Sequence, residues 1–200
     1  MKTDDPIFDW LKNPLNDLRL VLMRGLPSCG KSYKANEIAG GDDSIIFSAD
    51  KFFGKTCEEY VQNWNLQKLF VAHKVCKKGA KMAMQRRAPL VIIDNTNTVM
   101  RELSPYFDLA VQYGYKVEIE EPTSSWWVND IAPYLLDKPK YKKELEKACE
   151  FLAEKSKKTH CVPLSSIQKM MARYQPMINF QDLVNSFCKR YPDGKITEEE

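Results

Sequence analysis

The chain has 200 residues, of which 44% are hydrophobic and 28% are charged, and this length suits one globular domain with a buried core. Its net charge of +3 permits a polyanionic partner but falls short of the strongly basic balance of a dedicated nucleic-acid binder. No apolar run reaches the ~18 residues of a membrane span, and the N-terminus lacks a signal-peptide pattern, so we expect a cytoplasmic or nuclear protein.

The cysteines form no C-x-x-C pair, and the chain is too long to need disulfides for its stability. We therefore expect all of them to be reduced thiols. The six are Cys29, Cys57, Cys76, Cys149, Cys161 and Cys188.

The first structured part of the chain contains a complete phosphate-binding loop, G-x-x-x-x-G-K-S, from Gly25 to Ser32. An apolar run at residues 18–23 predicts a buried strand before it, and residues 32–39 predict a helix that ends at Gly40. In such a loop, backbone amides and the helix dipole converge on phosphate oxygens. Lys31 would contact the β and γ phosphates, and the Ser32 hydroxyl would ligate Mg²⁺.

We therefore expect ATP or GTP to bind here with Mg²⁺; a chance match on a surface loop is the alternative. The predicted nucleotide contacts are Gly25, Pro27, Ser28, Cys29, Gly30, Lys31, Ser32 and Tyr33. Cys29 adds a separate hypothesis, because a thiol at a helix N-terminus can have a lowered pKa and be oxidised, which would block ATP. A passive small residue is the alternative at this position.

Residues 44–48 predict a second short strand, which ends close to Asp50. Ligands of open parallel sheets bind beyond the carboxyl ends of the strands, so Asp50 can serve as general base toward a hydroxyl acceptor. A turn or helix cap is the alternative. Residues 51–64 predict an irregular loop, and Asn65 can cap a helix over 66–87. Its predicted buried stripe contains Leu66, Leu69, Phe70, His73, Cys76, Ala80, Ala83 and Met84.

A third strand is predicted at 90–93 and ends in Asp94, which has the position of a Walker B carboxylate and would hold Mg²⁺ directly or through water. A cap or turn residue is the alternative. A helix over 101–112, a stop at Gly114 and a strand over 115–120 follow. Strands that alternate with helices in this way predict a parallel sheet. The expected fold is therefore a P-loop NTPase three-layer α/β/α sandwich with a helical lid.

The lid is expected over residues 122–163, with its most regular helix at 140–155, and it is followed by helices at 165–174 and 181–189. Lys155, Lys157 and Lys158 lie near its end and could bring positive charge to a transferring phosphate. A solvated basic run is the alternative. We expect residues 1–17 to be an N-terminal tail, 18–175 the P-loop domain and 176–200 a C-terminal extension.

Taken together, these motifs resemble the P-loop polynucleotide 5′-hydroxyl kinase family of the phage end-healing type, and they look closest to its animal branch. The chain is also similar to the N-terminal domain of cyclic-nucleotide phosphodiesterases. The matching segments are Arg24-Gly25-Leu26-Pro27, Gly30-Lys31-Ser32, Phe47-Ser48-Ala49-Asp50, Ile92-Ile93-Asp94-Asn95-Thr96-Asn97, Gly114-Tyr115, Glu121-Pro122, Trp126-Trp127 and Thr159-His160-Cys161-Val162-Pro163.

The resemblance implies ATP-dependent phosphorylation of a 5′-hydroxyl end of RNA or DNA. Asp50 would then be the general base, Lys31 a catalytic phosphate contact, and Lys157 the lid cation. Asp94 or Asn95 would contact the metal or the acceptor. Further substrate contacts are expected at Thr96, Asn97 and His160.

Two departures from the family pattern leave other functions open. Phe53 stands where the phage enzyme has an arginine, and lysines stand at 157 and 158 where the family tends to carry arginine. The first alternative is an ATP-binding interaction module with weak catalysis, whose lid and Trp126-Trp127 bind a protein or RNA partner. The second is a small-molecule kinase.

Overall fold

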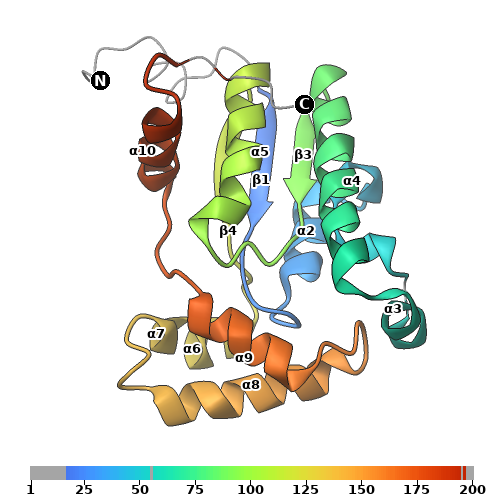
Figure 1. Cartoon of the computed structure of the whole chain (residues 1–200), viewed down its shortest axis with the longest axis vertical. Helices are drawn as coiled ribbons and strands as arrows, with labels where there is room; N and C mark the ends of the chain where they lie inside the picture. Colours follow the sequence, from blue (N-terminus) through green and yellow to red (C-terminus); the bar gives the residue numbers. More distant parts are fainter. Residues whose placement is uncertain (1–16, 55, 195, 197–200) are drawn as a thin grey trace.

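The computed structural model describes residues 17–54, 56–194 and 196. The expected N-terminal tail therefore lies, except for Asp17, outside the described residues. The fold is an α/β sandwich built on a four-stranded parallel sheet with the strand order β2-β3-β1-β4, and a group of helices lies beyond one end of the sheet (Figure 1). The predicted fold class is thus confirmed.

Most of the elements that were predicted around the sheet are present. Strand β1 spans Arg19–Met23, β3 spans Leu90–Ile93 and β4 spans Lys116–Glu120. Helix α2 covers Lys31–Ala39 and α5 covers Met100–Tyr113, and each ends at a glycine in the left-handed conformation. These elements follow from local signals, namely short apolar runs for the strands and glycine stops for the helices.

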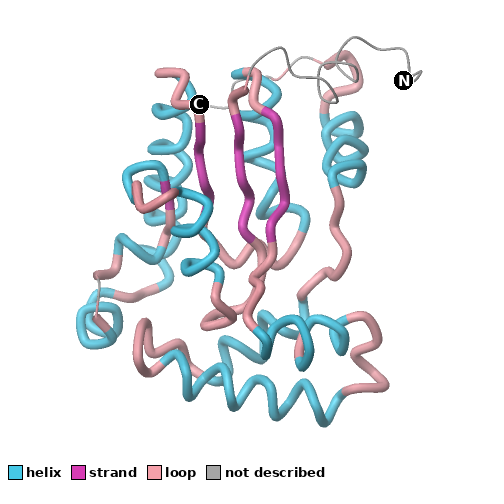
Figure 2. The backbone as a smooth tube through the Cα atoms, turned by 180° about the vertical axis from the view of Figure 1, so that it is seen from behind, coloured by secondary structure: helices cyan, strands magenta, loops and turns pink. Residues whose placement is uncertain are grey.

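The core lies mainly on one face of the sheet, where helices α4, α5 and α10 pack (Figure 1). Helix α4 spans Leu66–Gln85 and α10 spans Phe180–Arg190. In the described part of the chain, α2 is the helix that packs on the opposite face, against Val21, Met23 and Ile92 (Figure 2). All strands point toward the same end of the sheet, so the loops that carry the predicted site residues meet there.

The helices beyond that end form a second core of their own. They are α6 (Ser125–Asp130), α7 (Ala132–Leu135), α8 (Lys142–Ser156) and α9 (Leu164–Arg173). We call residues 122–173, which contain these four helices, the lid; it extends beyond the expected end at residue 163 because α9 packs on α8 in the same core. Leu26 and Cys29 of the phosphate loop belong to the same hydrophobic cluster as Trp127 and Leu152, so the lid is packed directly onto the phosphate loop.

Two predictions of local structure were wrong. The second strand is only β2, Ile46–Phe47, because Asp42 accepts hydrogen bonds from the backbone and hydroxyl of Ser44 and a 3₁₀ turn occupies Asp43–Ile45. The predicted loop over 51–64 contains helix α3, Cys57–Asn63, which begins with a capping box of Thr56 and Glu59.

The buried stripe of α4 was also predicted wrongly at its start. Leu66 and Phe70 are 76% and 64% exposed, and His73 is exposed. The first turns of α4 pack instead through Leu69 and Ala72 onto the cluster of Ala49, Phe53 and Tyr60. The prediction did not include this cluster as a packing partner, so it misplaced the inward face of α4 by about one residue.

The cysteines are not all thiols, which corrects the sequence-based expectation. Cys57 and Cys161 form a disulfide although 104 residues separate them, because the fold brings α3 and the loop between α8 and α9 together. Cys29, Cys76, Cys149 and Cys188 are free. No helix among the described residues is long and apolar enough to cross a membrane.

Candidate active site

The phosphate loop has the backbone geometry that anion binding requires. Gly25, Ser28 and Gly30 all have positive φ angles, of 140°, 59° and 99°, which turn successive amides toward one side. A Cβ atom on Gly25 would lie 2.6 Å from the Cys29 sulfur, so only glycine fits there. The loop therefore presents amides at the N-terminus of α2, as the sequence predicted.

The lid fixes the outer side of this loop. The Ser124 hydroxyl donates a hydrogen bond of 2.7 Å to the carbonyl oxygen of Cys29, and Trp126 Nε1 donates one of 3.4 Å to the carbonyl of Ser28. Because these carbonyls are engaged by the lid, they do not face the concave side of the loop. That side is left to the amides.

Lys31 is held close to the loop that it would serve. Its side chain is buried, with 8% exposure, and its Nζ donates a 2.8 Å hydrogen bond to the carbonyl oxygen of Leu26. Tyr33, two residues further along α2, is 77% exposed. Lys31 is thus a confined cation, whereas Tyr33 presents its ring to solvent.

Asp94 has the properties expected of a metal ligand. It is 7% exposed, and its Oδ1 is a buried oxygen with no hydrogen-bond partner among the described residues. Burial raises the pKa of this carboxyl, while Lys31 and a hydrogen bond with Ser32 act in the opposite direction. A buried carboxylate oxygen without a partner next to the Ser32 hydroxyl fits Mg²⁺, a cation that prefers oxygen ligands.

Asp50 follows β2, the strand next to β3 in the sheet. It is the first residue of a 3₁₀ turn, Asp50–Phe52, just beyond β2, and it is close enough to raise the pKa of Asp94 electrostatically. The Tyr60 hydroxyl donates a 3.0 Å hydrogen bond to its Oδ1. Sequence reasoning missed Tyr60, although the capping-box pattern Thr56-x-x-Glu59 was available as a signal for the helix that carries it.

Asn95 and Asn97 are engaged inside the protein. Asn95 accepts a 2.9 Å hydrogen bond from the backbone amide of Ala49 and donates to Tyr106, so it holds the segment before Asp50. Asn97 donates to the carbonyl of Met23 at 2.7 Å, and the carbonyl of Thr96 accepts from the amide of Gly25. These side chains and backbone groups connect β1 and β3 beneath the site.

Three predicted residues of the lid, His160, Lys157 and Lys155, lie in different surroundings. The ring of His160 lies 5.0 Å from that of Tyr60, centroid to centroid, and its Nδ1 is buried without a partner among the described residues. Lys157 has a 66% exposed side chain and forms an ion pair of 2.5 Å with Glu154. Lys155, by contrast, lies over the ring of Trp126 at 3.9 Å, and the indole nitrogen of Trp126 donates to the carbonyl of Ser28 in the phosphate loop.

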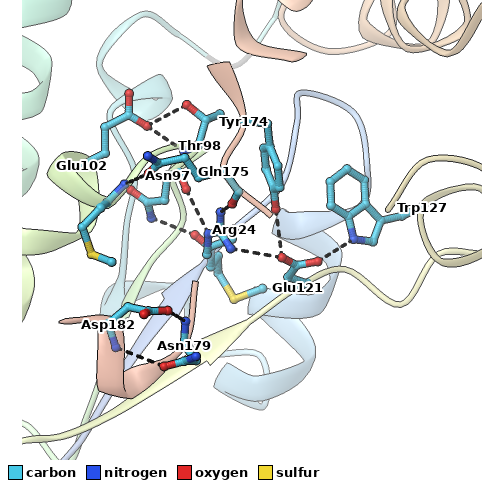
Figure 3. Close-up of polar contacts among 12 residues, drawn as sticks. Arg24, Asn97, Thr98, Glu102, Glu121, Trp127, Tyr174, Gln175, Asn179 and Asp182 are labelled. Atoms are coloured by element: carbon cyan, nitrogen blue, oxygen red, sulfur yellow. Dashed lines mark hydrogen bonds and ion pairs between the residues drawn. The ribbon is translucent and has the colours of Figure 1, made fainter. Parts of the chain in front are cut away.

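Arg24 forms a buried junction between the sheet and the lid that sequence reasoning did not assign (Figure 3). It is 1% exposed and donates to the carbonyls of Asn97 and Gln175. Its third contact is Glu121, which also accepts from Tyr174 at 2.9 Å and from Trp127 at 3.2 Å. This network joins β1 to both ends of the lid.

A groove of about 860 Å³ lies elsewhere, along the outer side of α5. None of the predicted site residues lines it. Its cations include Lys77, Lys81 and Arg101 from α4 and α5. We place the site at the phosphate loop because the buried carboxylate and the oriented amides are there.

The hypothesis of an acidic, reactive Cys29 was wrong. Burial raises the pKa of this thiol to about 11, and Lys31 lowers it by less. At pH 8, about three units below this pKa, the thiol is deprotonated in about one molecule in 10³. The amides at the helix N-terminus do not compensate for the loss of hydration.

We therefore expect Cys29 to resist alkylation in the folded protein. Iodoacetamide at pH 8, followed by peptide mass spectrometry, should modify the partly exposed Cys188 well before Cys29. The same treatment after unfolding should label both. Equal labelling of Cys29 and Cys188 in the folded state would contradict the expectation.

The chain is similar in sequence to known proteins. A family model described as an AAA domain matches residues 20–128. The chain is 30% identical to human NEDD4-binding protein 2 over 174 residues, which are 84% of this chain and 8% of that protein. It is also 30% identical to the 2′,3′-cyclic-nucleotide 3′-phosphodiesterase of Pongo abelii over 115 residues, 54% of this chain and 24% of that protein.

The chain thus matches less than a tenth of the human relative and about a quarter of the phosphodiesterase. These two matches confirm the resemblance that the sequence motifs indicated. A solved structure from Chloroflexus aurantiacus aligns with a TM-score of 0.47 and 12% identity, over 82% of this chain and 85% of that one.

Proposed function

The chain belongs to the AAA-domain family of P-loop proteins, and on that basis we propose that it transfers the γ-phosphoryl group of ATP or GTP, with Mg²⁺, to a 5′-hydroxyl of RNA, DNA or a nucleotide. The observation that carries the proposal is the order of groups at one end of the sheet. The phosphate loop follows β1, Asp94 follows β3, and Asp50 follows β2, and these three strands are adjacent in that order.

Phosphoryl transfer requires charge neutralisation, alignment and a group that accepts the proton of the acceptor. In the proposed reaction, Lys31 and the loop amides bind the β and γ phosphates, and Ser32 and Asp94 hold Mg²⁺. The ion, when bound, neutralises charge on the phosphate oxygens. Asp50 orients the acceptor hydroxyl and takes its proton. Lys155 is the lid cation whose position beside Trp126 supports a contact with phosphate.

A second candidate function is supported by two of the departures from the family pattern. Phe53 is completely buried, so it packs in the core where the phage enzyme has a charged residue. Lys157 pairs with Glu154 at the surface and so is not directed to the phosphate loop by any contact described here. Both features favour an ATP-binding interaction module with weak catalysis, which would bind a protein or RNA partner.

Replacement of Asp50 by asparagine tests the first function. We expect Asp50→Asn to lower transfer of a radiolabelled γ-phosphate to a 5′-hydroxyl oligonucleotide by about 10² to 10⁴-fold, the usual contribution of a general base. Binding of Mg²⁺-ATP, measured by calorimetry, should change little. Asp130→Asn, at an exposed position in α6, is the matched control and should leave transfer unchanged.

Two results would reject the kinase proposal. If the unmodified protein binds Mg²⁺-ATP but transfers no phosphate, and Asp50→Asn changes neither property, the interaction module is the better description. If a nucleoside competes with the oligonucleotide and is itself phosphorylated more efficiently, the acceptor is a small molecule.

A further inference from the structure

Tyr60 is buried next to the proposed base, with 9% of its surface exposed. Its hydroxyl donates to Oδ1 of Asp50 at 3.0 Å, and its ring contacts the rings of Phe53 and His160 at centroid distances of 5.1 and 5.0 Å. Burial, and then the charge of Asp50, raises the pKa of the Tyr60 phenol well above its usual value. The phenol therefore remains protonated and acts only as the donor to Asp50.

The helix that carries Tyr60 depends on contacts outside itself. α3 has seven residues, too few for a helix to be stable alone. The Thr56 capping box fixes its start, and Asn63 Nδ2 donates to the carbonyl of Phe53 at 3.1 Å near its end. A third anchor is covalent, since Cys57, one turn before Tyr60, is bonded to Cys161 of the lid.

The lid segment at this contact is held in an unfavourable state. Cys161 has a positive φ of 50°, which costs energy for a residue with a side chain. The adjacent His160 has a buried Nδ1 without a partner among the described residues, which also costs energy. Both costs occur in the two residues that the disulfide holds against α3. The Cys161 amide donates a 2.8 Å hydrogen bond to the carbonyl of Ser156, which holds the loop to α8, and the disulfide is the restraint that joins the loop to α3 beside the His160–Tyr60 contact.

We propose that Tyr60 is a positioning residue that orients the Asp50 carboxylate, and that the lid keeps Tyr60 in place through His160 and the Cys57–Cys161 disulfide. The inference rests on the proposed function, because it assigns Asp50 as the base. One carboxylate oxygen is occupied by Tyr60, which leaves Oδ2 to accept the proton of the acceptor hydroxyl. Orientation of this group consequently depends on a bond between two segments that are far apart in the sequence.

The disulfide provides a reversible way to loosen this arrangement. A dithiol reductant transfers two electrons and two protons to the bond: the S–S bond breaks, Cys57 and Cys161 become thiols, and the reductant forms its own disulfide. The other described cysteines are already thiols and do not react. Reduction should release His160 and Cys161 from α3 and allow Tyr60 to leave Asp50.

The first experiment separates the hydroxyl of Tyr60 from its ring. Tyr60→Phe keeps the packing against Phe53 and His160 but removes the hydrogen bond, so we expect kcat for 5′-hydroxyl transfer to fall about tenfold, with KM for ATP unchanged. The matched control is Tyr113→Phe. The hydroxyl of Tyr113 accepts a hydrogen bond from Gln85 away from the site, so its removal should leave kcat unchanged.

The second experiment tests whether the lid acts through Tyr60. Reduction of the unmodified protein should lower kcat toward the value of Tyr60→Phe and increase amide hydrogen exchange in α3. In Tyr60→Phe, reduction should have no further effect on kcat. The double variant Cys57→Ser, Cys161→Ser should have the same lowered kcat as the protein treated with reductant, whether or not reductant is present.

Three other outcomes of these experiments would each contradict part of the proposal. Transfer that is unaffected by Tyr60→Phe removes the positioning role of Tyr60 while the proposed function stands. An equal effect of reduction in the unmodified protein and in Tyr60→Phe shows that the lid does not act through this hydroxyl. Absence of transfer by the unmodified protein removes both the proposed function and this inference.

Discussion

Replacing Lys31 by methionine is expected to lower phosphoryl transfer by about 10² to 10³-fold, the size associated with loss of a charge-stabilising donor in a confined site. The Lys31 ammonium is buried beside the phosphate loop and contacts the carbonyl of Leu26. The predicted lid cation Lys157 is exposed and paired with Glu154, so it is poorly placed to substitute. Methionine keeps an unbranched side chain that is one heavy atom shorter, and it removes the charge and the donor.

Two measurements check this expectation. Calorimetric titration with Mg²⁺-ATP should show strongly weakened binding, and the transfer assay should show the loss of rate. Lys34→Met is the matched control, because Lys34 is on the same helix and pairs with Glu37 at its surface. If Lys31→Met bound Mg²⁺-ATP as well as the unmodified protein, the phosphate loop would not be the nucleotide site.

Replacing Arg24 by methionine is expected to lower the free energy of unfolding by roughly 3 kcal/mol, mainly because two carbonyl acceptors lose their donor at about 1 to 3 kcal/mol each; the side chain of Glu121 is 36% exposed, so loss of its ion pair contributes less. Arg24 is 1% exposed and bonds to Glu121 and to the carbonyls of Asn97 and Gln175. Methionine fills a similar volume but leaves these acceptors without their donor, and an unsatisfied buried acceptor is costly. Urea denaturation followed by circular dichroism measures the change.

The control for this prediction is Arg19→Met, at the start of the strand that Arg24 directly follows. Arg19 pairs with Glu118 at 2.7 Å, but its side chain is 43% exposed, so the change should cost no more than about 1 kcal/mol. Adding Glu121→Gln to Arg24→Met should recover part of the loss, because it removes the carboxylate charge that was left unpaired. Equal destabilisation by Arg19→Met and Arg24→Met would contradict the assignment of Arg24 as the junction of sheet and lid.

The parts of the fold that could be predicted from the sequence are those determined by neighbouring residues. The phosphate loop lies between an apolar strand and a helix with a glycine stop, and the strand at 90–93 was predicted with its observed bounds. Asp94 follows that strand directly, so its place at the sheet edge was also predictable. The functional roles of these residues remain predictions.

The parts that could not be predicted depend on contacts between distant segments. The bond between Cys57 and Cys161 and the ring contact between Tyr60 and His160 each join residues about 100 positions apart. The true inward face of α4 is set by Phe53 and Tyr60, which come from the segment that was expected to be a loop. In the case of Cys29, complete burial by the lid determines the pKa, and the sequence motif contains no information about that burial.

Helix α10 has a consequence for how the chain folds during synthesis. Leu183, Val184 and Phe187 of this late helix belong to the same hydrophobic cluster as Leu20 and Leu22 of the first strand. Ribosomes add about 5 to 20 residues per second, so many seconds pass between synthesis of the first strand and synthesis of α10. Until α10 has left the exit tunnel, the apolar part of the sheet that it covers stays exposed in the nascent chain.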